Sequence, residues 1–134
     1  MVIVKGLVLT AEGPIPVEKL EVGMLVIDRG HRARKLTKIE KVHLHQTLHF
    51  ERNKNLVVAG NSVLFTITGM RSIITLKNVK KAKAGRIQML LDANKLQDDT
   101  MKIKKEEATG YRLFIEGGSD VMVNGYNVTD REVE

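Results

Sequence analysis

The sequence contains no cysteine. A disulfide framework, a thiolate metal site and a cysteine nucleophile are therefore all excluded. Aromatic residues make up only 4% of the chain and tryptophan is absent, although 43% of the residues are hydrophobic. The core of the folded protein must consequently be aliphatic, built from valine, isoleucine, leucine and methionine.

Long apolar runs are also missing. None approaches the roughly 18 to 20 residues that a membrane-spanning helix requires. The opening residues, MVIVKGLVLTAEG, lack a basic leader followed by a small-residue cleavage site. Met1 resembles an initiator residue, which predicts that no upstream peptide is released. We therefore expect cytoplasmic synthesis, with the protein staying in the cell or in a particle assembled there, such as a virion.

Basic residues are in excess, with 22 Lys and Arg against 16 Asp and Glu, giving a formal net charge of +6. Such a charge favours acidic partners, including nucleic acid, through a field that does not depend on sequence. The basic residues form two clusters, the first over residues 31–35 and the second over residues 77–83. Neither cluster contains an aromatic residue to stack on bases, so a solvated charged surface, or a face for an acidic protein, is favoured over a nucleic-acid surface. The candidate interaction residues are Arg32, Arg34, Lys35, Lys77, Lys80, Lys81 and Lys83.

Short β-prone runs separated by glycine turns recur along the chain. Residues 36–50 alternate polar and apolar side chains, which predicts one long strand with a bulge or bend. Residues 93–101 are polar and predict a loop, whereas LKNVKKAKA (76–84) predicts a short helix. We predict one all-β domain over residues 1–130, with short antiparallel strands and at most one or two short helices, followed by a short tail over 131–134.

Three histidines, His43, His45 and His49, lie on one side of the predicted strand. Residues two apart in a strand are separated by about 7 Å, which allows two imidazoles to share a metal ion. A solvated polar face is the simpler interpretation, so we predict no metal and no cofactor and keep the three histidines as a candidate site.

Two pairs of adjacent carboxylates, Asp98-Asp99 and Glu106-Glu107, stand in polar segments. Neighbouring residues in a regular strand point to opposite faces, so neither pair forms an acid/base or two-metal site. We expect both pairs at the surface.

Four segments resemble, in order along the chain, the blocks of the Hint module that inteins share with the autoprocessing half of hedgehog proteins. They are VKGLVLTAEG with IPVEKLEVGMLVID, then LVVAGNSVLFT, then ITLKNVKKAKAGRIQMLLD, and finally GYRLFIEGGSDVMVNGYNVTD. The resemblance covers nearly the whole chain. It implies a horseshoe-shaped, pseudo-twofold all-β fold whose two ends meet in a central cleft.

The same resemblance implies that the catalytic groups are missing. Hint modules move an acyl group from a backbone nitrogen to a Cys or Ser side chain at the first residue, and the family pattern also carries a Thr, three His and an Asn. A thioether cannot form that ester or thioester, and a carboxylate, which is ionised at neutral pH, is a poor partner for cyclisation of the asparagine kind. The family positions for the nucleophile, the helper groups and the acceptor fall on Met1, Ala59, Ser62, Ser119, Thr129, Asp130 and Arg131.

Turn residues such as Asn124 and Gly125, by contrast, are retained. We therefore predict a catalytically inactive Hint-like domain, not an enzyme, that acts as a structural or assembly module. Its expected partners are other protein subunits, including copies of itself, and a phage tail, baseplate or head-associated protein is the expected context. The alternative is a basic nucleic-acid-binding accessory protein. A domain with residual self-processing is the least favoured hypothesis.

Overall fold

The computed structural model describes residues 1–66, 69–72, 86–90, 96–118 and 120–133, with the side chains of 86–90 and 96 left aside. Within these ranges the chain consists of antiparallel strands and one turn of 3-10 helix at Val17–Lys19. The all-β prediction is confirmed. The helix predicted over residues 76–84 lies outside the described residues. In the described part, no helix has the length and apolar character needed to cross a membrane.

The strands form one 12-stranded sheet in the order β11-β12-β7-β9-β10-β1-β6-β5-β4-β2-β3. In addition, β8 pairs with β7, β11 with β2 and β10 with β5. The bounds are β1 (Val2–Lys5), β2 (Leu7–Thr10), β3 (Gly13–Pro16), β4 (Leu25–Ile27), β5 (Ala33–Phe50), β6 (Val57–Ala59), β7 (Ser62–Thr66), β8 (Gly69–Arg71), β9 (Arg86–Leu90), β10 (Leu96–Ile115), β11 (Asp120–Val123) and β12 (Tyr126–Glu132).

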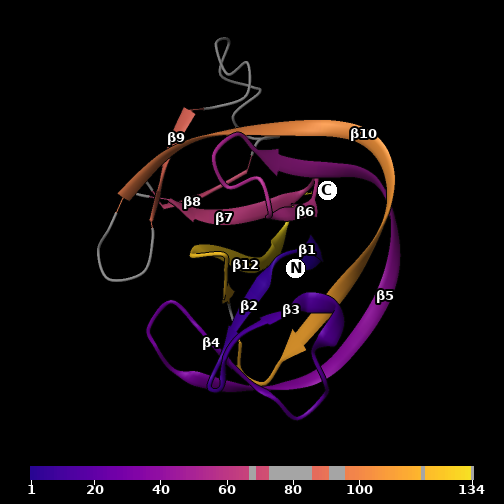
Figure 1. Ribbon diagram of the computed structural model, residues 1–134, viewed down its shortest axis with the longest axis vertical. Helices are drawn as coiled ribbons and strands as arrows, with labels where there is room; N and C mark the ends of the chain where they lie inside the picture. The colour runs from indigo at the N-terminus through magenta and orange to yellow at the C-terminus, as the bar shows by residue number, and fades with distance from the viewer. Residues whose placement is uncertain (67–68, 73–85, 91–95, 119, 134) are drawn as a thin grey trace.

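The two longest strands, β5 and β10, pair from Met101 opposite Phe50 to Ile115 opposite Leu36. Figure 1 shows the two strands side by side as a long curved ribbon around the outside of the molecule, with most of the shorter strands inside the curve. The long strand predicted over residues 36–50 is confirmed, and its register shifts supply the expected irregularity. The loop predicted over residues 93–101 is wrong from residue 96 onward, because β10 begins there and pairs with β9.

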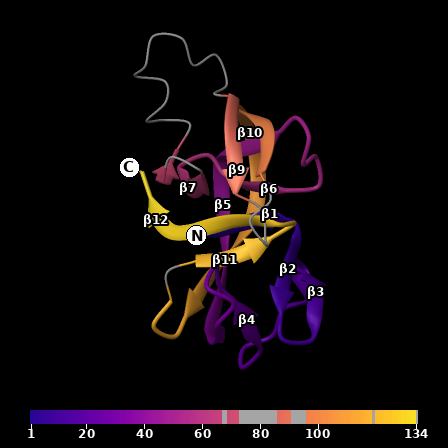
Figure 2. The same ribbon diagram turned by 90° about the vertical axis from the view of Figure 1, so that its left-hand side faces the viewer.

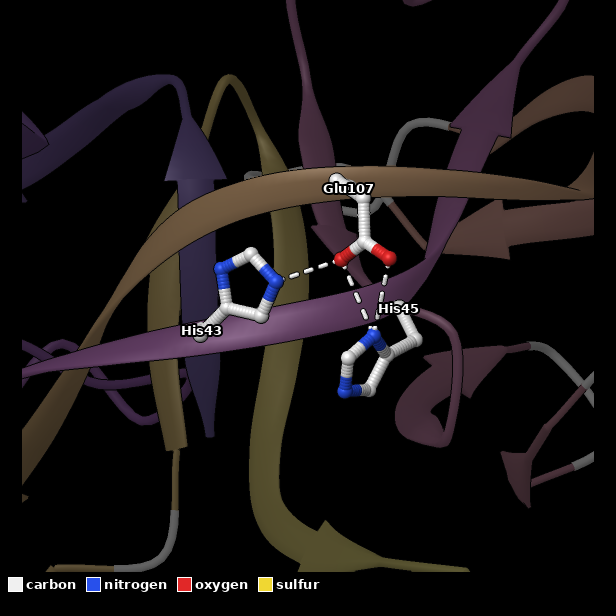
Figure 3. A group of neighbouring side chains, drawn as sticks. All are labelled: His43, His45 and Glu107. Atoms are coloured by element: carbon white, nitrogen blue, oxygen red, sulfur yellow. Dashed lines mark hydrogen bonds and ion pairs between the residues drawn. The ribbon is translucent and has the colours of Figure 1, made fainter.

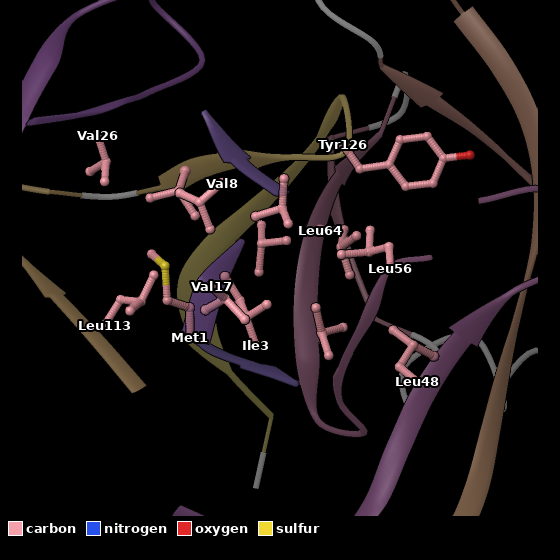
Figure 4. Close-up of a cluster of buried hydrophobic side chains, with 14 of the residues drawn as sticks. Met1, Ile3, Val8, Val17, Val26, Leu48, Leu56, Leu64, Leu113 and Tyr126 are labelled. Atoms are coloured by element: carbon pink, nitrogen blue, oxygen red, sulfur yellow. The ribbon is translucent and has the colours of Figure 1, made fainter. Parts of the chain in front are cut away.

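The core is aliphatic, as the composition predicts. Valines, leucines and isoleucines from β1, β2, β4, β5, β6, β7, β10, β11 and β12 bury their side chains together (Figure 4). Phe50 and Tyr126 are the aromatic members of the cluster and meet edge to face, with ring centroids 5.2 Å apart. Burying this apolar surface is the main favourable contribution to folding.

Asp99 lies in the interior with only 2% of its surface exposed, so the expectation that this carboxylate is at the surface is wrong. Its oxygens accept hydrogen bonds from the backbone N–H of Arg52 at 2.8 Å and of Asn53 at 3.1 Å, and from the hydroxyl of Tyr126 at 2.5 Å. Burial and the nearby Asp99 hold the pKa of Tyr126 well above its usual range. One carboxylate thus ties the turn after β5 to both β10 and β12.

We expect Asp99→Asn to lower the free energy of unfolding by about 2–3 kcal/mol. The charge-assisted hydrogen bonds to the carboxylate would be replaced by weaker ones, and the NH₂ group of the amide would face N–H and O–H donors that it cannot bond. Chemical denaturation followed by circular dichroism measures this change. The neighbouring exposed Glu51 is the matched control, and Glu51→Gln should stay within about 0.5 kcal/mol of the parent. Equal effects of the two changes would contradict the role given to Asp99.

Candidate functional site: the central cleft

The first residue and the last strand meet at the centre of the molecule. The amino nitrogen of Met1 lies 3.1 Å from Glu132 Oε1, and the backbone N–H of Leu113 donates to the Met1 carbonyl at 3.3 Å. Just beyond β12, the backbone N–H of Val133 donates to the carbonyl of Asn61 at 2.9 Å. Both views place the N-terminus beside β12 (Figures 1 and 2). The meeting of the two ends expected from the Hint resemblance is therefore present.

A cleft of about 420 Å³ opens at this meeting point. Its charged groups are Arg112, Asp130 and Glu132, and Arg112 Nη2 lies 3.5 Å from Glu132 Oε2. Met1 is 5% exposed and contributes its thioether side chain to the core beneath the cleft. A thioether has no ionisable proton, so the side chain at this position offers no acyl-transfer nucleophile.

The other family positions lie around β6, β7 and β12. Ala59 is buried at the end of β6. Ser62 is buried at the start of β7, and its hydroxyl has no hydrogen-bond partner among the residues that the structure describes. Thr129 donates its hydroxyl proton to the carbonyl of Val63 at 2.8 Å. Ser119 lies outside the described residues, while Asp130 is exposed and borders the cleft.

The first basic cluster surrounds a buried carboxylate. Asp28 Oδ2 accepts from Arg34 Nε at 2.9 Å and from Arg32 Nε at 3.2 Å, and Arg34 also donates to the carbonyl of Gly117 at 2.8 Å. Burial alone would raise the pKa of Asp28, but the hydrogen bonds from Arg34 and Arg32 outweigh it and hold the pKa below its usual range. These two arginines thus have an intramolecular role, whatever else they bind.

The other candidate interaction residues divide into two groups. Lys35 is exposed on β5, opposite Leu25 of β4. The second basic cluster, made of Lys77, Lys80, Lys81 and Lys83, lies outside the described residues. The interaction surface therefore stays a prediction from sequence.

The three candidate histidines share one face of β5 but do not form one group. His43 and His45 both hydrogen-bond to Glu107 on β10, as Figure 3 shows. His49 instead bonds to Thr47 at 2.9 Å and to Glu106 at 2.6 Å.

Glu106 and Glu107 are functional candidates that sequence reasoning missed. Both contact the histidine face, so the expectation that neighbouring carboxylates point apart is wrong here. The cause is a register shift between Lys105 and Ala108 of β10, which interrupts the strand's alternation. Nothing in the polar run around Glu106 marks a bulge, because its position depends on the partner strand.

Solved structures with the same fold come from inteins and intein-like domains. The bacterial intein-like domain from Clostridium thermocellum matches with a TM-score of 0.75 at 14% identity, over 96% of this chain and 98% of that one. The gp41-1 intein matches with a TM-score of 0.72 at 14% identity, over 96% and 97%. A DnaB intein from Synechocystis gives 0.64 at 13%, over 96% and 98%. No protein-family model and no curated protein sequence matches the chain.

Two buried hydroxyls beside the cleft should respond in opposite directions when they are removed. Ser62→Ala deletes a hydroxyl that has no partner among the described residues, and it should leave the free energy of unfolding unchanged or raise it by up to about 1 kcal/mol. Thr129→Val deletes a hydroxyl that donates to Val63 and should lower it by about 1 kcal/mol. Urea unfolding of both variants tests this. A loss for Ser62→Ala as large as that for Thr129→Val would mean that Ser62 has a partner.

Proposed function

We propose, starting from the Hint fold of this chain, that it is a non-catalytic structural module that joins protein subunits in an assembly. We favour a phage virion part, in the tail, baseplate or head-associated region, as that assembly. The observation that carries the proposal is the cleft, where the backbone geometry of the fold is kept and the groups for acyl transfer are replaced.

Acyl transfer requires a nucleophile and a group that removes or supplies its proton. Met1 offers a thioether in the nucleophile position, and the Thr129 hydroxyl is directed to the carbonyl of Val63. Among the residues that the structure describes, no histidine borders the cleft. Glu132 is engaged by the amino group of Met1 and by Arg112. This arrangement supports a structural role for the cleft, in which its side chains pack and form ion pairs, rather than a role in cleaving the backbone.

A second surface supports binding to protein. Val22 is 60% exposed and Leu25 44% exposed, and both line a groove of about 610 Å³ beside the turn between β2 and β3. Exposed apolar side chains grouped at a groove and bordered by polar residues are typical of protein-binding sites. Glu12 and Glu21 supply the polar border. Other subunits, including further copies of this chain, are the partners that we favour.

The neighbouring sheet edge argues for docking through side chains. At the end of the sheet, β3 carries Pro14 and Pro16, whereas the N–H of Val17 points inward and donates to Gly6 at 3.0 Å. By alternation, both prolines place their nitrogens on the outer side, where a proline has no N–H to offer. A partner strand therefore gains little by extending the sheet at β3, and the Val22–Leu25 groove is the better contact.

The virion context is argued from the fold family. It rests on the occurrence of Hint modules in mobile genetic elements and viruses, which is a fold-level analogy.

We expect the purified chain to keep its intact mass through extended incubation, with and without an added thiol, because the cleft lacks an acyl-transfer nucleophile at Met1. Intact-protein mass spectrometry measures this, with an active intein treated in parallel as the positive control. Any product of backbone cleavage at either end that accumulates with time would favour the self-processing hypothesis instead.

If the groove is the docking surface, replacing its apolar side chains by charges should release the chain from its assembly. We expect the parent protein, isolated from its native source without dissociation, to be recovered within a large particle. The double variant Val22→Asp with Leu25→Asp should remain in the soluble fraction. Met70 on β8 is also exposed and serves as the matched control, so Met70→Asp should assemble normally. Recovery of the parent as a free monomer would refute the assembly role.

The net charge of +6 favours a second candidate, a nucleic-acid-binding accessory protein. Two arginines of the first basic cluster already pair with Asp28, which reduces the charge available to phosphates. This candidate requires DNA binding that weakens steeply as the salt concentration rises. Absence of binding at low salt would eliminate it.

A further inference from the structure

We propose that His43, His45 and Glu107 form a binding site for a divalent transition-metal ion of the zinc, nickel and copper class, on the exposed face of the β5–β10 ribbon.

The backbone brings these groups together through a bulge. Lys105 pairs with Gln46 and Ala108 pairs with Leu44, so a single residue of β5, His45, faces two residues of β10. His43 and His45 are two apart on β5 and share a face. An extra residue in β10 breaks its alternation and brings Glu107 onto the same face as the two imidazoles. A regular strand would give that face only one of the two glutamates.

The three side chains converge on a common point (Figure 3). His45 Nδ1 lies 2.9 Å from one carboxylate oxygen of Glu107 and 3.0 Å from the other, and His43 Nε2 hydrogen-bonds to the same carboxylate. One ligand atom from each residue lies within 4.8 Å of the others. Ligands of a tetrahedral zinc ion, with bonds of about 2.0–2.1 Å, lie about 3.3 Å apart. Small rotations of exposed side chains are enough to reach that geometry.

The donor set suits this class of ion. Imidazole nitrogen together with carboxylate oxygen binds zinc, nickel and copper, and two histidines with one carboxylate leave coordination positions for water. A glutamate side chain is ordinarily an anion at neutral pH, as a carboxylate metal ligand must be.

Stability does not account for the cluster. The side chains of His43, His45 and Glu107 are 59%, 77% and 65% exposed. Exposed pairs of this kind contribute little to the free energy of unfolding, because solvent screens them and three side chains lose rotamer freedom. The mutual contacts of the three side chains therefore do not explain why they converge, whereas a bound cation would.

His49, although it lies on the same face, belongs to a different arrangement. Its Nε2 closes a triangle with Thr47 Oγ1 at 2.9 Å and Glu106 Oε1 at 2.6 Å, and Thr47 donates to Glu106 at 2.5 Å. Thr47 is buried, and the cation of Lys104, two residues before Glu106 on the same strand β10, acts on the Glu106 carboxylate. The geometry therefore replaces the three-histidine candidate by two histidines and Glu107, and it leaves His49 as an internal control.

Calorimetric titration of the untagged chain with zinc chloride near neutral pH tests the site. We expect one zinc ion per chain, and a loss of affinity of about tenfold or more in each of His43→Ala, His45→Ala and Glu107→Gln. The matched control His49→Ala should bind zinc within about twofold of the parent, because its side chain is not a ligand. All four changes are at partly or fully exposed positions, and circular dichroism without metal confirms that each variant folds.

Imidazole nitrogen NMR locates the ion independently of affinity. Zinc should shift the Nε2 resonance of His43 and the Nδ1 resonance of His45 and leave those of His49 in place. Absence of binding heat, affinity that the three site variants leave unchanged, or an equal loss in His49→Ala would each overturn the proposal.

Discussion

Continuous backbone pairing between β5 and β10 is the constraint on which the rest of the structure depends. Every residue of the two strands carries a backbone N–H and C=O, and these groups need hydrogen-bond partners along the whole length of the strand pair. The pairing runs from Phe50 and Met101 at one end to Leu36 and Ile115 at the other, with register shifts in between. Asp99 lies near one end, Leu113 reaches the cleft near the other, and the glutamate bulge lies between them.

Part of this arrangement is visible in the sequence. Alternation over residues 36–50 predicts β5, the scarcity of aromatics predicts an aliphatic core, and Asn124-Gly125 predicts a tight turn. That turn has a backbone φ of 48° at Asn124 and 80° at Gly125, and the Asn124 side chain accepts from the N–H of Leu7 at 2.7 Å. Each of these signals is local, since it depends on a few adjacent residues or on composition alone.

The features that could not be predicted depend on distant partners. Polarity suggests exposure, yet Asp99 is buried because donors from Arg52, Asn53 and Tyr126 surround it. Glu107 faces the histidines only because of the register with β5. The four segments that resemble Hint blocks predicted the fold and the cleft correctly. Their order and spacing along the chain were enough for this, although the residues at the catalytic positions differ. Gly110 on β10 is a further case, since a Cβ there would lie 2.5 Å from Val2 Cγ1 and the neighbouring side chain would have to shift.

The two prolines of β3 have a consequence for the behaviour of the protein in concentrated solution. Fibrils grow when a new strand finds both donors and acceptors at the end of a sheet. At β3 the outer side presents carbonyl oxygens at Pro14 and Pro16 but no donor. Polymerisation through this end of the sheet is thus blocked by covalent structure rather than by charge repulsion, and neither acid nor high salt can remove the block.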